Sequence, residues 1–198
     1  MKSNHSLCIL VAFFLCLSCS KEKYKTNEAL LPLAVGNQWN YENVFYNEDG
    51  SVSNQSTGSL TILKDTSING STHYSDGYTL YKNTDENTVM SSIDGKDFFI
   101  FFKRTNVDKK TIETWSGSIG NCTATDILTL FTDLTNINGY QSLKNEAALK
   151  NCNGVRRKTI SYLKPGIGIT KRLLYHMSST NDSLYLRFKQ ELKSYRLK

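Results

Sequence analysis

Tight-turn signals interrupt this chain too often for it to form long helices. Asp-Gly at residues 49–50 and 94–95 and Asn-Gly at 69–70 are the strongest, because these dipeptides favour the turns that join adjacent antiparallel strands. The runs between them are short and rich in β-branched and aromatic residues. With 2 prolines and 12 glycines in 198 residues, collagen-like and linker-like chains are excluded. The sequence therefore predicts a β-rich protein built from many short strands.

The predicted strands alternate as a half-buried sheet requires. In the last one, Leu184, Phe188 and Leu192 share one face, whereas Arg187 and Lys189 share the other. We expect one antiparallel, strongly curved sheet or a partly open, lipocalin-like barrel, with a β-sandwich as the alternative. The predicted strands are residues 39–46, 59–64, 72–81, 89–93, 97–103, 111–116, 157–163, 169–175 and 183–197.

Residues 98–102, Phe-Phe-Ile-Phe-Phe, are apolar at every position. A strand with one face in water alternates apolar and polar side chains, so this strand is expected to be covered on both faces. The competing interpretation is an open apolar groove for a ligand. In that case Phe99 or Phe101 would be exposed to solvent.

Two segments follow a helical period instead. Residues 123–134 repeat apolar side chains at helical spacing and begin with a pattern like a capping box. Residues 142–150 include the strong helix formers Glu-Ala-Ala-Leu. We expect two short helices, the first covering the strand at 98–102, so that Phe131→Ala would cost about 3–5 kcal/mol as a core truncation. The helical stripe consists of Ile127, Leu128, Leu130, Phe131 and Leu134.

The N-terminus carries an export signal. Basic residues precede an uninterrupted apolar run at residues 7–17, which is about half as long as a membrane-spanning helix. The run ends in Leu-Ser-Cys-Ser at residues 17–20, which resembles the lipobox of bacterial lipoproteins, although Cys16 stands where that family usually has leucine. The resemblance implies lipidation of Cys19. An ordinary cleaved signal peptide is the alternative.

This interpretation divides the chain into three parts. Residues 1–18 are the expected lipoprotein signal peptide, residues 19–29 a polar tether and residues 30–198 a single β-rich domain. Ser20, rather than aspartate, follows the cysteine, which in the resembling lipoproteins favours the outer membrane. We therefore expect a lipid-anchored outer-membrane protein, with the side of the membrane left open.

Two cysteines remain once Cys8, Cys16 and Cys19 are assigned to the signal peptide and the lipid. Export places Cys122 and Cys152 in a compartment that permits disulfides, so we expect them to pair. A reactive thiol or a metal ligand is the alternative, but no histidine lies near either cysteine in the sequence. A disulfide closing a loop of this length would contribute about 3–4 kcal/mol in the chain-entropy model.

We find no catalytic, metal-binding or cofactor-binding motif. There is no Gly-x-Ser-x-Gly turn and no histidine pair at metal-ligand spacing, and Gly166 with Gly168 fits a tight turn better than a nucleotide-binding loop. We therefore predict a non-enzymatic protein without metal or cofactor. The aromatic residues either pack the core or line a ligand cavity. The candidate lining residues are Trp39, Tyr41, Phe99, Phe101 and Trp115.

Several blocks of the sequence resemble a group of uncharacterised Bacteroidota lipoproteins. Pro-Leu-x-x-Gly-Asn-x-Trp-x-Tyr at residues 32–41 is the most specific block, and Pro-Gly-x-Gly at residues 165–168 is a later one. Two more blocks lie at residues 65–74 and 192–195, and every block after the first is looser. The resemblance implies a β-rich exported domain. It implies no known activity and therefore transfers no catalytic residues.

These predictions favour a monomeric, lipid-anchored envelope protein that binds a partner protein or an apolar ligand. The net charge of +6 suits a solvated surface, and nucleic acid is not an expected partner outside the cytoplasm. A hydrolase of envelope polymers and a purely structural envelope component are the rival hypotheses. A deep aromatic pocket would favour ligand binding, and a flat apolar patch would favour binding of a partner protein. Convergent carboxylates or a Ser–His pair would favour a hydrolase.

Overall fold

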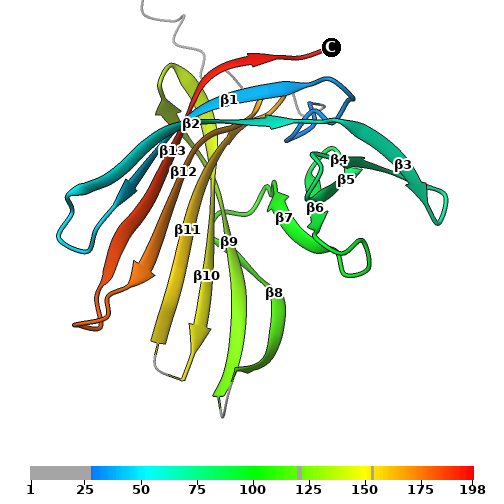
Figure 1. Ribbon diagram of the computed structural model, residues 1–198. Coiled ribbons are helices and arrows are strands. Elements are labelled where there is room, and N and C mark those ends of the chain that lie inside the picture. Colours follow the sequence, from blue (N-terminus) through cyan, green and yellow to red (C-terminus); the bar gives the residue numbers. More distant parts are fainter. Residues whose placement is uncertain (1–27, 120–121, 153) are drawn as a thin grey trace, which may run out of the picture.

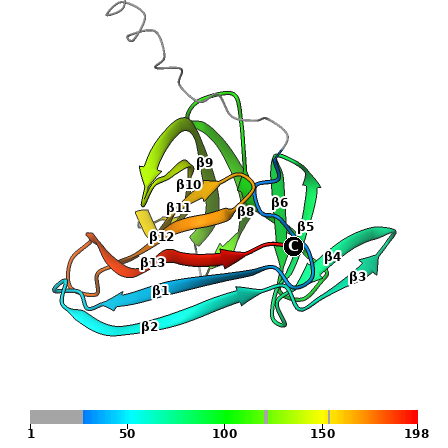
Figure 2. The ribbon, with the colours of Figure 1, turned by 90° about the horizontal axis from the view of Figure 1, so that it is seen from above.

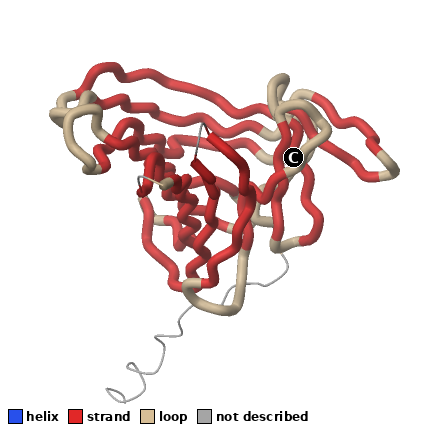
Figure 3. The backbone as a smooth tube through the Cα atoms, turned by 90° about the horizontal axis from the view of Figure 1, so that it is seen from below, coloured by secondary structure: helices blue, strands red, loops and turns tan. Residues whose placement is uncertain are grey.

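A computed structural model describes residues 28–119, 122–152 and 154–198, which form two antiparallel sheets (Figure 1). No helix occurs within these ranges, and the tube in Figure 3 is strand interrupted by turns. The prediction of a mainly antiparallel β protein is therefore confirmed. The predicted signal peptide, Cys19 and most of the predicted tether lie outside the described residues.

The large sheet has eight strands in the order β2-β1-β13-β12-β11-β10-β9-β8. Strands β8 to β13 form a meander, and β1 pairs with β13, so that the first and last strands lie side by side. Seen from above, the sheet follows an arc (Figure 2). Its strands are β1 (Gln38–Tyr46), β2 (Val52–Thr61), β8 (Lys110–Ile119), β9 (Cys122–Ile137), β10 (Tyr140–Asn151), β11 (Gly154–Lys164), β12 (Gly168–Met177) and β13 (Leu184–Arg196).

The small sheet is a five-stranded meander that lies on the concave side of the arc (Figure 1). The edge strands of the large sheet, β2 and β8, do not pair with each other, so lipocalin-like closure is not seen. Two facing sheets agree better with the sandwich alternative than with a barrel. The strands of the small sheet are β3 (Lys64–Ile68), β4 (Ser71–Ser75), β5 (Leu80–Asp85), β6 (Thr88–Ser92) and β7 (Phe99–Lys103).

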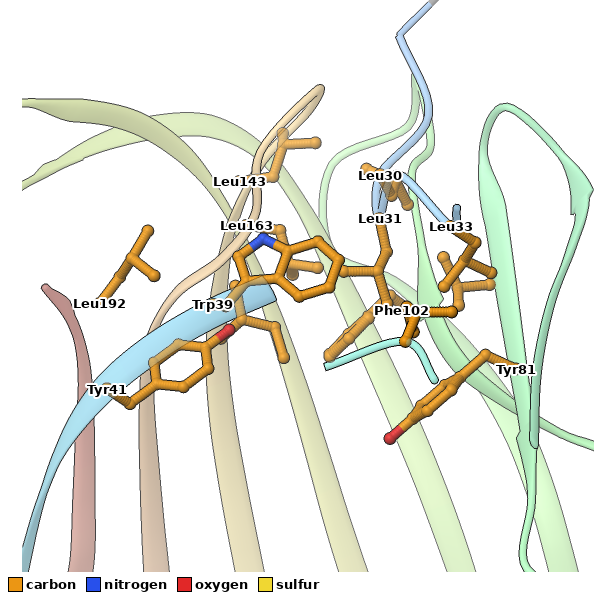
Figure 4. Packing of buried hydrophobic residues seen from close by; sticks show 13 residues of the cluster. Leu30, Leu31, Leu33, Trp39, Tyr41, Tyr81, Phe102, Leu143, Leu163 and Leu192 are labelled. Atoms are coloured by element: carbon orange, nitrogen blue, oxygen red, sulfur yellow. The ribbon is translucent and has the colours of Figure 1, made fainter. Parts of the chain in front are cut away.

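One hydrophobic cluster joins the two sheets (Figure 4). It takes side chains from β1 and β10 to β13 of the large sheet, from β5 to β7 of the small sheet, and from the segment that precedes β1. Burial of Leu30 and Leu31 places the beginning of the packed structure at the end of the predicted tether. The cluster comprises Leu30, Leu31, Leu33, Trp39, Tyr41, Ile62, Tyr81, Val89, Phe102, Leu143, Leu163, Ile169 and Leu192.

The two predicted helices are wrong, because residues 122–137 and 140–151 form the long hairpin β9–β10. The residues between them, Asn138 and Gly139, have φ angles of 51° and 87°, and positive φ at both positions is the conformation of a two-residue hairpin turn. The Asn-Gly dipeptide was a visible signal for this hairpin. The helical spacing of the apolar residues before it predicted a helix instead.

Alternation and β propensity explain why residues 122–137 are extended. Ala124, Leu128 and Leu130 are buried and occupy alternate positions, which is the period of a strand. Threonine recurs on the segment, and its branched Cβ favours a sheet over a helix. Pairing on both sides then overrides the helix propensity of Glu146 and Ala147 in β10, which lies between β9 and β11.

The two most specific blocks of the family resemblance meet at one corner of the large sheet. The indole Nε1 of Trp39 donates a hydrogen bond to the carbonyl oxygen of Ile167. Gly168 has a φ of +108°, and a Cβ there would lie 2.7 Å from Leu31 Cδ1 and 3.4 Å from Trp39 Nε1. Only glycine fits this close approach without displacing its neighbours. The blocks therefore have a structural explanation.

Candidate functional site

A cavity of about 480 Å³ lies on the concave face of the large sheet, below the small sheet. We call it the concave cavity. Its walls come from alternate residues of β9 to β12, because side chains at every second position of a strand face the same side. The far parts of these strands extend beyond the small sheet (Figure 1). Its apolar lining includes Phe99, Phe101, Leu128, Leu174 and Phe188.

One buried amide fixes the small sheet over this cavity. Asn145 of β10 is 3% exposed, and its Oδ1 accepts a hydrogen bond of 3.0 Å from the backbone N–H of Lys103 at the end of β7. The Nδ2 of Asn145 donates to the carbonyl oxygen of Lys144 at 3.0 Å. The buried amide therefore has partners on both sides, and it holds β7 against the middle of the large sheet.

A bulge in β7 brings two of its phenylalanine rings together. Val89 pairs with Phe102 and Met90 with Ile100, so Phe101 has no partner residue in β6. A bulge of this kind turns two successive side chains towards one side. The rings of Phe101 and Phe102 accordingly have centroids 4.0 Å apart.

The expectation that residues 98–102 are covered on both faces is not met. Phe102 is 2% exposed and packs into the core between the sheets. Phe99 is 43% exposed, and Phe99, Phe101 and Phe102 all line the concave cavity. The predicted covering helix is absent from the described residues, since its segment is β9. The structure therefore corresponds to the competing interpretation, in which one face of this strand borders an open cavity.

Arg172 of β12 is a half-buried, charged residue that lines the concave cavity. Its Nε and Nη2 atoms are buried and have no hydrogen-bond partner. The carbon atom Cζ of the guanidinium lies 5.2 Å from the ring centroid of Phe101 and 5.9 Å from that of Phe102. Burial lowers the pKa of Arg172, and the nearby hydroxyls of Tyr41 and Tyr81 oppose that shift. The side chain still carries its charge at neutral pH, because arginine does not deprotonate in proteins.

A second cavity of about 220 Å³ adjoins the same arginine. Arg172 and Phe101 line both cavities, and Tyr41 and Tyr81 line the second. The hydroxyl of Tyr41 is buried without a partner, and burial raises the pKa of Tyr41. The hydroxyl of Tyr81 donates to Asp76 Oδ2 at 3.0 Å, and burial is the main cause that raises its pKa to about 12. Both phenols therefore stay protonated at neutral pH and can act as donors.

The outer part of the concave cavity is polar. Asp126, Arg157 and His176 contribute to its lining. Burial raises the pKa of Asp126, and Arg157 acts in the opposite direction. Burial also lowers the pKa of His176, with Arg157 and Arg187 adding to that effect. Two arginines and one carboxylate among the described lining residues leave the cavity with a net positive charge.

The aromatic residues that the sequence offered as ligand-lining lie in different places. Phe99 and Phe101 line the concave cavity, and Tyr41 lines the second cavity. Trp39 is 0% exposed and belongs to the core, so the alternative of core packing holds for it. Trp115 is half-buried on β8, beside Gly117 and away from both cavities.

Sequence reasoning missed Arg172, the residue with the most unusual surroundings. It stands between Lys171 and Leu173 in a predicted strand, where charged and apolar residues do not alternate regularly. Without a regular alternation, the sequence does not show which face of the sheet this side chain occupies. The pairing of β12 decides this, because it places Arg172 opposite Ser161 of β11, which also lines the cavity.

Cys122 and Cys152 form a disulfide at the far end of the β9–β10 hairpin. Their Cα atoms are 5.7 Å apart, which is a normal separation for a disulfide. The bond joins the start of β9 to the residue after β10, at the open end of the hairpin. Within the described ranges no group of three or more His, Cys, Asp or Glu side chains is placed to hold a metal ion. Nor do the described residues contain a helix long and apolar enough to cross a membrane.

Two solved structures are similar to this chain. One is a candidate exported protein with a YmcC-like fold from Bacteroides fragilis, at 11% identity, covering 86% of this chain and 100% of the other, with a TM-score of 0.49. The second is a candidate lipoprotein from Parabacteroides distasonis, at 10% identity, covering 86% of this chain and 99% of the other, with a TM-score of 0.48. No protein-family model matches the sequence, and no curated protein matches it significantly.

Proposed function

We propose that this protein is a lipid-anchored envelope protein whose folded part binds an apolar ligand in the concave cavity. The observation that carries the proposal is the cavity itself, with a volume of about 480 Å³ and phenylalanine and leucine in its walls. Ligand sites in proteins are concave, mostly apolar and contain a few polar groups that orient the ligand. The anchor rests on the apolar run and Cys19 of the sequence, and the outer-membrane location rests on Ser20.

The lining favours binding over hydrolysis. A glycosidase needs two carboxylates across the scissile bond, whereas Asp126 is the sole carboxylate among the described residues that line the cavity. His176 shares the cavity with Ser161 and Ser91, but among the described lining residues no hydrogen bond joins a serine to the histidine. A purely structural component would have no use for an open apolar cavity beside a packed core.

A neutral apolar probe tests ligand binding. N-phenyl-1-naphthylamine is expected to bind the folded protein with an increase in fluorescence. Leu174→Trp should abolish that increase, because the larger side chain fills the cavity. Leu173 is the matched control, since the residue before Leu174 on the same strand points to the opposite face. Leu173→Trp is expected to bind like the wild type. Equal binding by both variants, or no binding by the wild type, would contradict the proposed function.

Lipidation of Cys19 is tested by metabolic labelling in a bacterial host with a radioactive fatty acid. The wild-type chain should be labelled, because the cysteine closes an apolar run of signal-peptide length. Cys19→Ala should carry no label and should leave the membrane fraction. Cys16→Ala is the control, and it should be labelled like the wild type. Equal labelling of Cys19→Ala would overturn the anchor assignment.

A further inference from the structure

Packing alone does not explain why an arginine occupies position 172. A buried charge is normally paired, because transfer of an unpaired ion from water into a protein interior is costly. Among the described residues, no carboxylate forms an ion pair with Arg172. The rings of Phe101 and Phe102 offset part of that cost through cation–π contacts, but they leave the N–H groups unsatisfied.

The two unpaired atoms of Arg172 form one edge of the guanidinium. The N–H bonds of Nε and Nη2 on that edge are parallel, and a pair of parallel donors matches the two oxygens of a carboxylate. Tyr41 lines the adjoining cavity with Arg172, and its hydroxyl is a third buried group without a partner. Each of these groups can donate a hydrogen bond, and an anion is the acceptor that suits such donors.

We propose that the ligand of the concave cavity is an aliphatic carboxylate, whose head pairs with Arg172 and whose chain lies against Phe99, Leu174 and Phe188. This inference rests on the proposed function and names its ligand class. The chain extends from Arg172 towards His176, a distance of about 13 Å along the strand, which suits a medium-length alkyl chain. Phe101 lines both cavities together with Arg172, so the carboxylate head lies beside its ring.

The charge balance of the cavity supports an anion. Arg157 and Arg172 face a single carboxylate, Asp126, among the described lining residues. A neutral hydrocarbon would leave the N–H groups of Arg172 unsatisfied in the bound state as well as in the free state. A carboxylate removes that penalty on binding, so its affinity exceeds that of a neutral ligand with the same chain.

The test compares dodecanoate with dodecan-1-ol, which have the same chain length and differ in the charge of the head. Both are measured at neutral pH by displacement of N-phenyl-1-naphthylamine from the folded protein. The wild type is expected to bind dodecanoate about 10- to 100-fold more tightly than dodecan-1-ol, the ratio for a charge-assisted pair. Arg172→Met should abolish this preference and leave the affinity for dodecan-1-ol unchanged. Arg172→Lys should keep part of it.

Arg156→Met is the matched control, because it removes an exposed arginine of β11 and should keep the full preference. Ligand-free Arg172→Met should melt no lower than the wild type, since an unpaired buried charge has been removed. A lower melting temperature with the dodecanoate preference intact would assign Arg172 to structure and overturn the inference.

The remaining outcomes separate the inference from the proposed function. Equal binding of dodecanoate and dodecan-1-ol by the wild type would overturn the carboxylate assignment, while ligand binding itself would stand. Tighter binding of dodecyl phosphate than of dodecanoate, lost in Arg172→Met, would also overturn that assignment. If neither the probe nor dodecan-1-ol binds the wild type, the proposed function fails first.

Discussion

Trp39→Ala is expected to lower the free energy of unfolding by about 3–5 kcal/mol, the range for truncation of a buried aromatic residue. Trp39 is fully buried and contacts the corner where the first block of the sequence meets Gly168. The substitution also leaves the carbonyl oxygen of Ile167 without its donor. Urea unfolding followed by circular dichroism measures the change without relying on tryptophan fluorescence.

Trp115→Ala is the matched control for that result. Trp115 is half-buried on β8, an edge strand, and contributes nothing to the core cluster. Trp115→Ala should lower the free energy of unfolding clearly less than Trp39→Ala does. Trp39→Phe should fall between the two, because the ring keeps most of its packing and loses the hydrogen bond. A loss for Trp39→Ala no larger than that for Trp115→Ala would contradict the core assignment.

Phe102→Ala is expected to lower the free energy of unfolding by about 3–5 kcal/mol, whereas Phe131→Ala should lower it by less than about 1.5 kcal/mol. Phe102 is 2% exposed and carries the packing of the small sheet onto the large one. Phe131 is half-buried on the outer face of β9, where the Lys144 ammonium lies 4.0 Å from its ring centroid. Urea unfolding of each variant and of the wild type measures both changes in the free energy of unfolding.

Comparing the two losses of unfolding free energy distinguishes the observed hairpin from the helix that the sequence predicted. A helix over residues 123–134 would bury Phe131 against the strand at 98–102, and its truncation would then be the more expensive one. The hairpin places Phe131 on the convex side and makes Phe102 the core residue. A larger loss for Phe131→Ala than for Phe102→Ala would therefore contradict the observed topology.

Local patterns were sufficient for most strands. The predicted strands at residues 39–46, 89–93, 157–163 and 169–175 match β1, β6, β11 and β12, whose bounds differ from the predictions by at most a few residues. Turn chemistry explains this success, because Gly36, Gly50, Gly70 and Gly166 all have positive φ. The β9–β10 hairpin was missed because its apolar residues satisfy a helical and an extended spacing at once. Only the neighbouring strands remove that ambiguity.

The β class of this protein, its turns and the alternation of its last strand follow from local sequence patterns, because each of these depends on residues close together in the chain. The cavity and Arg172 depend on the pairing of β10, β11, β12 and β13 and on the small sheet that lies over them. Whether a side chain is buried, paired or open to a ligand is a property of its neighbours in space. Those neighbours come from segments far apart in the chain, so no local pattern predicts them and they are known once the strands are packed together.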